Sequence, residues 1–307
     1  MGESASGRGW RTRILTNRSV LAGGTLLLLV VVLAFALPPM FHADPFAVDP
    51  AHRLAKPGPG HLLGTDTFGR DLLARVAAGA KSSLIVGGAV AGLSGLLGTV
   101  IGLLASAFTV MDHVLMRVCD GLMAIPALLL AVALAAALGP SVPNLIAALT
   151  VVATPSVARL VRSRALAVTS ETFVEASRAQ GAGTWHVTVK HVLPNVLSVL
   201  AVQVTFIFAD AIITEAALSF LGAGVPTPQP SWGNILYDGK GVILQAPMMT
   251  IAASAALVVT VLALNLLGDG LRDLVDPRAT RSGRQPGMLT RLVGTRRGDV
   301  VLQGGPA

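Results

Sequence analysis

Residues 175–195 read EASRAQGAGTWHVTVKHVLPN, and apolar runs long enough to cross a bilayer flank them on both sides. The stretch itself is polar, and its glycine pair, Gly181 and Gly183, predicts a turn between two short helical segments. Pro194 suits the first turn of the next apolar run, because that position needs no backbone N–H donor. The chain therefore leaves the membrane for a short polar insert, residues 169–194, and then returns to it.

The composition excludes an ordinary soluble globular domain. Of the 307 residues, 53% are hydrophobic and 13% are charged, and the mean hydropathy is +0.70. Because lipid offers no partners for open backbone groups and no barrel-like alternation is visible, every span must be a helix. We predict an all-α polytopic membrane protein with six transmembrane helices. The candidate spans are residues 19–40, 82–108, 113–138, 143–168, 195–220 and 246–268.

The rest of the chain divides around these spans. We expect an N-terminal tail (1–18), a first transmembrane helix (19–40), an outer loop with an amphipathic helix (41–80), a five-span core that contains the insert (81–270), and a C-terminal tail (271–307). The last segment is rich in arginine, glycine and threonine, which predicts disorder. In the second span, the pairs Gly88/Gly92 and Gly98/Gly102 predict close helix packing, within this chain or across a dimer interface.

Lysine and arginine are distributed unevenly along the chain. With the N-terminus placed inside, 17 of the 23 fall on the inner side, which predicts that both termini are cytoplasmic. The first outer segment, through Lys81, opposes this orientation, since it holds five of the six remaining positive charges, partly offset by four aspartates. Membrane topology therefore explains the net charge of +7, and we expect no nucleic-acid partner.

Residues for catalysis or metal binding are not grouped in this sequence. The single cysteine, Cys119, excludes an internal disulfide and is interpreted as a small buried residue. The six histidines show no metal-ligand spacing with cysteine or carboxylates. No phosphate-binding loop of the form GxxxxGK[ST] occurs. We therefore expect a chain that is not an enzyme and that binds no cofactor or metal of its own.

Two acidic residues stand out because they lie within or near the end of the fifth span. A charge at the bilayer centre costs roughly 2.5–3.5 kcal/mol on insertion scales, so Asp210 and Glu215 need a reason to be there. Three interpretations stay open: a proton relay, a polar pore lining, and buried structural carboxylates.

The outer segments carry a second group of candidates. Either Thr65 or Asp66 is expected to cap a helix that starts near Gly69. Trp232 follows three prolines and is interpreted as a lipid-interface anchor or as part of an outer gate. The candidate docking or gate residues are Asp66, Arg70, Asp71 and Trp232.

The insert resembles the coupling-helix signature of inner-membrane permease subunits of ABC importers, Glu-Ala-Ala-x-x-x-Gly followed by Ile-x-Leu-Pro. Ser177 replaces an alanine of that pattern, and His191 stands where the pattern has isoleucine. The coupling residues that the resemblance assigns are Glu175, Ala176, Ser177, Gly181, Leu193 and Pro194.

Three further stretches resemble the C-type permeases of the dipeptide, oligopeptide and nickel class. They are HLLGTDTFGRDLLAR (61–75), AALSFLGAGVPTPQPSWGNIL (216–236) and LNLLGDGLRDLVDPR (264–278), and the likeness extends over roughly residues 15–278. The resemblance implies a type I ABC importer permease fold in the inner membrane of a bacterium.

This resemblance also implies a set of partners. They are a second, non-identical permease that completes the pore, two cytoplasmic ATPase subunits that hold ATP and Mg, and an extracytoplasmic substrate-binding protein. The coupling helix is expected to dock in a groove of the ATPase, and the substrates to be short peptides, with nickel chelates or other small solutes as related alternatives.

Two other classes of protein are alternatives for a helical membrane chain of this kind. An ion-coupled secondary transporter could use Asp210 and Glu215, but the two halves of the chain show no internal repeat, and that class does not explain the polar insert. A purely structural scaffold subunit has no positive signal in the sequence.

Overall fold

The computed structural model describes residues 17–41 and 44–275, and in this part of the chain all regular secondary structure is helical. The expected disordered C-terminal tail falls almost wholly outside these residues, as does most of the N-terminal tail. The long helices are α2 (Arg18–Phe41), α3 (Leu72–Ala107), α6 (Val142–Thr169), α9 (Leu193–Phe220) and α11 (Pro247–Val275). The shorter ones are η1 (Pro50–His52), α4 (Thr109–Met123), α5 (Ala127–Leu138), α7 (Thr172–Ala179), α8 (Thr184–Val187), the π-helical η2 (Thr188–Val192) and α10 (Trp232–Lys240).

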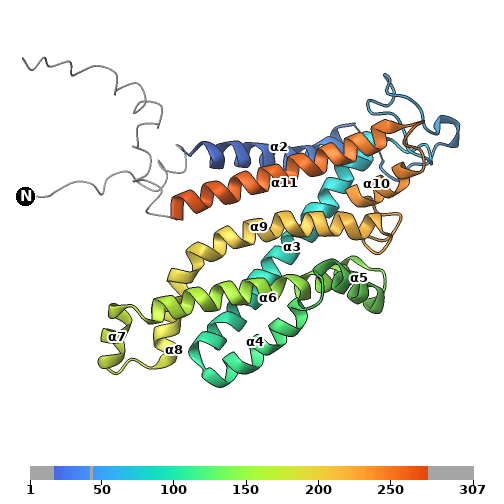
Figure 1. Cartoon of the computed structure of the whole chain (residues 1–307). Helices are drawn as coiled ribbons and strands as arrows, with labels where there is room; N and C mark the ends of the chain where they lie inside the picture. The colour runs from blue at the N-terminus through green and yellow to red at the C-terminus, as the bar shows by residue number, and fades with distance from the viewer. Residues whose placement is uncertain (1–16, 42–43, 276–307) are drawn as a thin grey trace, which may run out of the picture.

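Five of the long elements are apolar enough to cross a membrane, and α4 with α5 make a sixth crossing if that bent pair is counted as one span. Helix α3 crosses the molecule diagonally and packs against α6 and α9, while α2 lies alongside α11 (Figure 1). Helices α7 and α8 lie at the same end as the start of α2 and the last turns of α11 (Figure 1). The segment 44–71 and α10 occupy the opposite end (Figure 1). This arrangement agrees with six membrane crossings, in which successive connections alternate between the two ends.

The third predicted span, residues 113–138, is not one continuous helix. Helix α4 ends at Met123, α5 begins at Ala127, and the two axes differ in direction by 94°. Pro126 lies between them, where it lacks an N–H donor and disfavours helical geometry at Ile125. The hydropathy of the segment suggested a span, but the proline divides it.

The amphipathic helix expected within the first outer loop is not a separate element. The chain turns helical at Leu72 and continues without a break to Ala107. At 1.5 Å per residue this helix is about 54 Å long, well beyond the roughly 30 Å hydrocarbon core. Its N-cap is Asp71, whose carboxylate accepts a hydrogen bond from the backbone N–H of Ala74 at 2.8 Å, so the expected cap at Thr65 or Asp66 is wrong.

The glycines of α3 allow the closest helix contact in the core. A Cβ atom at Gly98 would overlap Val157 of α6, and one at Gly102 would lie 2.7 Å from the Cβ of Val161. The Gly98/Gly102 pair therefore packs within the chain, one of the two interpretations left open. Gly92 differs, since a Cβ there would meet nothing within 4 Å.

We predict opposite effects for alanine at two of these glycines. Gly98→Ala should lower the free energy of unfolding by about 1–3 kcal/mol, because the added methyl group forces α6 away. Gly92→Ala should be neutral or stabilising by up to about 1 kcal/mol, because alanine has the higher helix propensity. Thermal unfolding of the detergent-solubilised protein measures both, and equal losses would contradict the α3–α6 contact.

Candidate functional site

The polar insert folds as two short helices joined by a tight turn at one end of the molecule. Val174 of α7 and Val187 of α8 are fully buried, and they form one hydrophobic cluster with Val168 of α6 and Val196 of α9. The insert is therefore packed firmly onto the two long helices that flank it.

Its outer face is exposed and mixed in character. Glu175 and Ala176 of the resemblance motif point outward, whereas Ser177 is half-buried, with its Oγ 3.4 Å from Nε2 of His191. Two aromatic side chains that the sequence reasoning did not single out are also exposed, Phe173 (48%) and Trp185 (66%). Their signal was available, because large aromatic rings are unexpected in an otherwise polar insert.

Gly181 forms the turn between α7 and α8. Its φ of +88° lies in the left-handed region, which only glycine adopts readily. A Cβ atom at this position would meet nothing within 4 Å in this chain. The turn is therefore open to the close approach of another molecule.

The helix after the turn runs without interruption into the fifth span. The π-helical turn η2 ends at Val192, directly before Leu193 and Pro194. The proline ring cannot coexist with the usual bond to the carbonyl of residue 190, and the wider π turn relieves that conflict. The segment Thr184–Phe220 is thus one long rod with its first turns in the insert.

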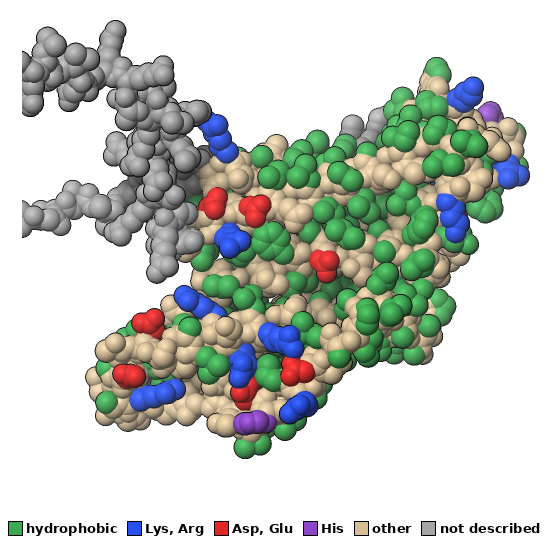
Figure 2. All heavy atoms as spheres, viewed as in Figure 1, with side chains coloured by type: hydrophobic (Ala, Val, Ile, Leu, Met, Phe, Trp, Pro, Cys, Tyr) green, Lys and Arg blue, Asp and Glu red, His purple; other side chains and the backbone are tan. Residues whose placement is uncertain are grey.

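Two ion pairs join α4 to α6 next to the insert. Arg162 binds both carboxylate oxygens of Asp112, with Nη2 2.6 Å from Oδ2, and Arg159 lies 2.5 Å from Asp120. Acidic and basic side chains lie close together at this end of the visible face, and further Lys or Arg side chains appear at the opposite end (Figure 2). The sequence reasoning used these arginines only for topology and missed the pairs.

The two carboxylates of the fifth span have different surroundings. Glu215 is fully buried, and it accepts hydrogen bonds at 2.7 Å from the hydroxyls of Ser83 on α3 and Ser219 on α9. Among the three interpretations, this geometry matches the buried structural carboxylate.

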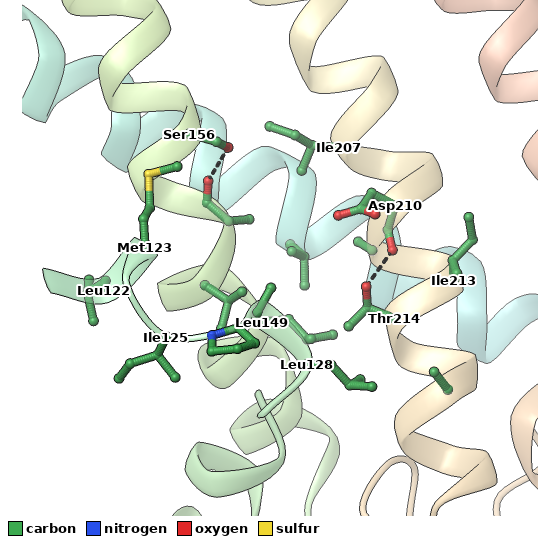
Figure 3. Close-up of a pocket in the computed structure, with 17 residues that line it drawn as sticks. Leu122, Met123, Ile125, Leu128, Leu149, Ser156, Ile207, Asp210, Ile213 and Thr214 are labelled. Atoms are coloured by element: carbon green, nitrogen blue, oxygen red, sulfur yellow. Dashed lines mark hydrogen bonds between the residues drawn. The ribbon is translucent and has the colours of Figure 1, made fainter. Parts of the chain in front are cut away.

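Asp210 lies one and a half turns earlier on α9 and faces a cavity of about 530 Å³ (Figure 3). The cavity lies between α9, α6 and the break that separates α4 from α5, with Ile125 and Pro126 in its wall. Asp210 therefore lines a cavity whereas Glu215 is enclosed, and the sequence could not distinguish the two.

The acidic and basic candidates of the outer segment form a buried network. The Oδ2 atom of Asp66 lies 2.6 Å from Nε of Arg70 and 3.2 Å from Nε of Arg75. Arg70 also reaches Asp238 of α10 at 3.6 Å. Burial raises the pKa of Asp238, and the neighbouring Arg75 and Arg70 oppose that shift. The network fastens the segment 44–71 to the start of α3 and to α10.

Trp232 is also part of the interior. Its side chain is 0% exposed, and its Nε1 donates a hydrogen bond to the carbonyl of Val76 at 3.1 Å. A lipid-interface anchor needs an exposed ring, so that interpretation of Trp232 is wrong. Asp71 serves as the cap of α3 and contacts His61 at 2.9 Å. Of the four outer candidates, Asp66, Arg70 and Trp232 are buried in the interior of this end, and Asp71 caps α3.

Residues 95–281 match the family described as binding-protein-dependent transport system inner membrane component. A Brucella abortus protein named as a peptide transport system permease is 45% identical, over 88% of this chain and 92% of its own. The glutathione transport system permease of Pectobacterium atrosepticum is 37% identical, over 88% and 90%. A permease of Escherichia coli named for D,D-dipeptide transport is also 37% identical, over 83% and 86%. Among solved structures, the inward-facing methionine ABC transporter MetNI has a TM-score of 0.49 at 23% identity, over 62% of this chain and 94% of that one.

We predict that the two carboxylates of α9 differ in their contribution to stability. Glu215→Ala should lower the free energy of unfolding by about 2–4 kcal/mol, because it leaves two buried hydroxyls without their acceptor and opens a void. Asp210→Asn should change it by no more than about 0.5 kcal/mol, because Asp210 is exposed to the cavity. Thermal unfolding in detergent compares them, and a larger loss at Asp210 would refute the assignment.

Proposed function

Because the chain belongs to the binding-protein-dependent transport system inner membrane components, we propose that it forms half of a heterodimeric pore that imports short peptides. The chain is a multi-pass membrane permease subunit of an ABC transporter. Peptides are the substrate class best supported, since the relatives above are named for peptide, glutathione and D,D-dipeptide transport. A second, non-identical permease would complete the pore.

Coupling to ATP is assigned to the insert, residues 169–194. The observation that carries this role is an exposed helix with an open glycine turn, fixed by buried valines to α6 and α9. A groove on a cytoplasmic ATPase subunit would receive α7, with Glu175 available to pair with a cationic group there. ATP binding shifts the pore only if the insert contacts the ATPase differently in the two states.

The remaining tasks fall to partner subunits. ATP and Mg would bind the two ATPase subunits, since this chain has no phosphate-binding loop. In the described residues, no group of three or more histidine, cysteine, aspartate or glutamate side chains could hold a metal ion. A substrate-binding protein would deliver peptide at the end formed by residues 44–71 and α10, opposite the insert.

The alternative function, an ion-coupled secondary transporter, is not supported by this family membership. The two carboxylates on which it depended have separate surroundings, because Glu215 binds serines between helices and Asp210 faces the cavity. A relay through both would need a path between them, and Glu215 is fully enclosed.

The first test is ATP hydrolysis by the reconstituted complex, with and without peptide-loaded binding protein. Gly181→Arg should abolish the stimulation and the uptake of peptide, because a bulky cation would block the approach of the ATPase. Gly181→Asn is the control for backbone geometry, since asparagine tolerates positive φ. Gly183→Arg is the control for charge, because that position has an ordinary φ of −69° and open space.

Both controls should retain most of the stimulated hydrolysis. Normal stimulation in Gly181→Arg would remove the coupling role from the insert. Loss in all three variants would indicate a general defect of the segment instead of a blocked contact at Gly181.

Orientation is tested by cysteine labelling in a Cys119→Ala background. Leu244→Cys, at a side chain that is 96% exposed, should react with a membrane-impermeant maleimide in intact spheroplasts. Ser170→Cys, in the exposed turn before α7, should react only in inside-out vesicles. The reverse pattern would place the insert outside and refute the cytoplasmic assignment of both termini.

A further inference from the structure

The cavity at Asp210 has the size and composition of a solute site. Its volume of about 530 Å³ falls within the range of small-molecule pockets. Its walls are mostly apolar, with Met123, Ile125 and Ile207 among them (Figure 3). Among the described residues that line it there is no lysine, arginine or histidine, so Asp210 carries the only formal charge that they contribute.

The two side-chain hydroxyls of the lining present only acceptors. The hydroxyl of Ser156 donates to the carbonyl of Ala153, and that of Thr214 to the carbonyl of Asp210, both at 2.8 Å. Each hydroxyl proton is thereby used, and the oxygen lone pairs remain. The carboxylate therefore sets a negative potential.

Asp210 differs from the other carboxylates of the spans between α3 and α9. Asp112 and Asp120 each bind an arginine of α6, and Glu215 binds two serine hydroxyls. In the described part of the chain, the Asp210 carboxylate faces open space instead (Figure 3). A charged group in an apolar span is stabilised by an opposite charge or by water in a cavity, and the described residues place no cationic side chain in this lining.

We propose that this cavity is a cation subsite of the translocation path, in which Asp210 binds the α-ammonium group of a passing peptide. The identity of the cation rests on the proposed function. An ammonium group carries three N–H donors and no acceptor, which matches a lining of one carboxylate and two hydroxyl oxygens. Apolar walls can contact side chains of many kinds without specific hydrogen bonds. Every free peptide carries an α-ammonium and an α-carboxylate, and of these two groups the ammonium is the one that the Asp210 carboxylate attracts.

The test uses a reporter cysteine in the purified complex of both permeases and both ATPase subunits, without binding protein. Ala127→Cys in a Cys119→Ala background places a thiol in the cavity wall, away from the carboxylate and the two hydroxyls. Dialanine should slow its alkylation by a maleimide several-fold, and N-acetyl-dialanine, which lacks the ammonium group, should not. Adding Asp210→Asn should abolish the protection, and Asp210→Glu should retain part of it.

Equal protection by both peptides, or protection that survives Asp210→Asn, would overturn the subsite. Absence of protection by either peptide would overturn it as well, as expected if a basic side chain of the partner permease already occupies Asp210. Stimulation of ATP hydrolysis by peptide-loaded binding protein, measured on the same complex, reads the proposed function separately. If peptide-loaded binding protein stimulates ATP hydrolysis but dialanine does not protect the cysteine, only the subsite is refuted. If no peptide stimulates hydrolysis by the wild-type complex, the proposed function and the subsite are both refuted.

Discussion

Lipid hydrocarbon offers polar groups no hydrogen-bond partner, so each one in these spans must be satisfied within the protein or must line a cavity. The acidic groups show both solutions. Asp112 and Asp120 of α4 bind arginines of α6, and Glu215 binds serines on α3 and α9. Each of these contacts joins helices or turns that would otherwise be held only by van der Waals packing, so the polar groups also fix how the spans are arranged.

The two ends of the molecule satisfy their polar groups in different ways. At the end formed by residues 44–71 and α10, Asp66 and its two arginines are buried together, and Trp232 is buried with its indole N–H bound to the carbonyl of Val76. The interior of that end is therefore held together by buried ion pairs and hydrogen bonds. At the other end, the insert keeps only its valines inside and leaves its charged and aromatic side chains exposed, as a surface that meets another subunit would.

Helix α9 connects these two ends. It continues from the insert through a π-helical turn, carries Asp210 at the cavity, and carries Glu215 where that side chain is buried against Ser83. Under the proposed function, a displacement of the insert by the ATPase is carried along one rod to the cavity wall. The break between α4 and α5 forms the facing wall, and broken helices in membranes occur where the chain lines a cavity. The cavity thus lies where a moving helix meets an interrupted one.

Hydropathy and a few motifs were enough to predict the helical class and the polar insert, because a bilayer permits few backbone solutions. The glycine turn and the proline at the start of α9 were likewise readable, since both follow from local backbone chemistry. Tertiary structure alone decided that Trp232 is buried, that α4 and α5 meet at 94°, and that Glu215 is enclosed while Asp210 is open. Each of these features depends on which face of a helix contacts partners that are distant in the sequence, as Ser83 is from Glu215. In an almost uniformly apolar span, the hydrophobic periodicity does not indicate which face that is.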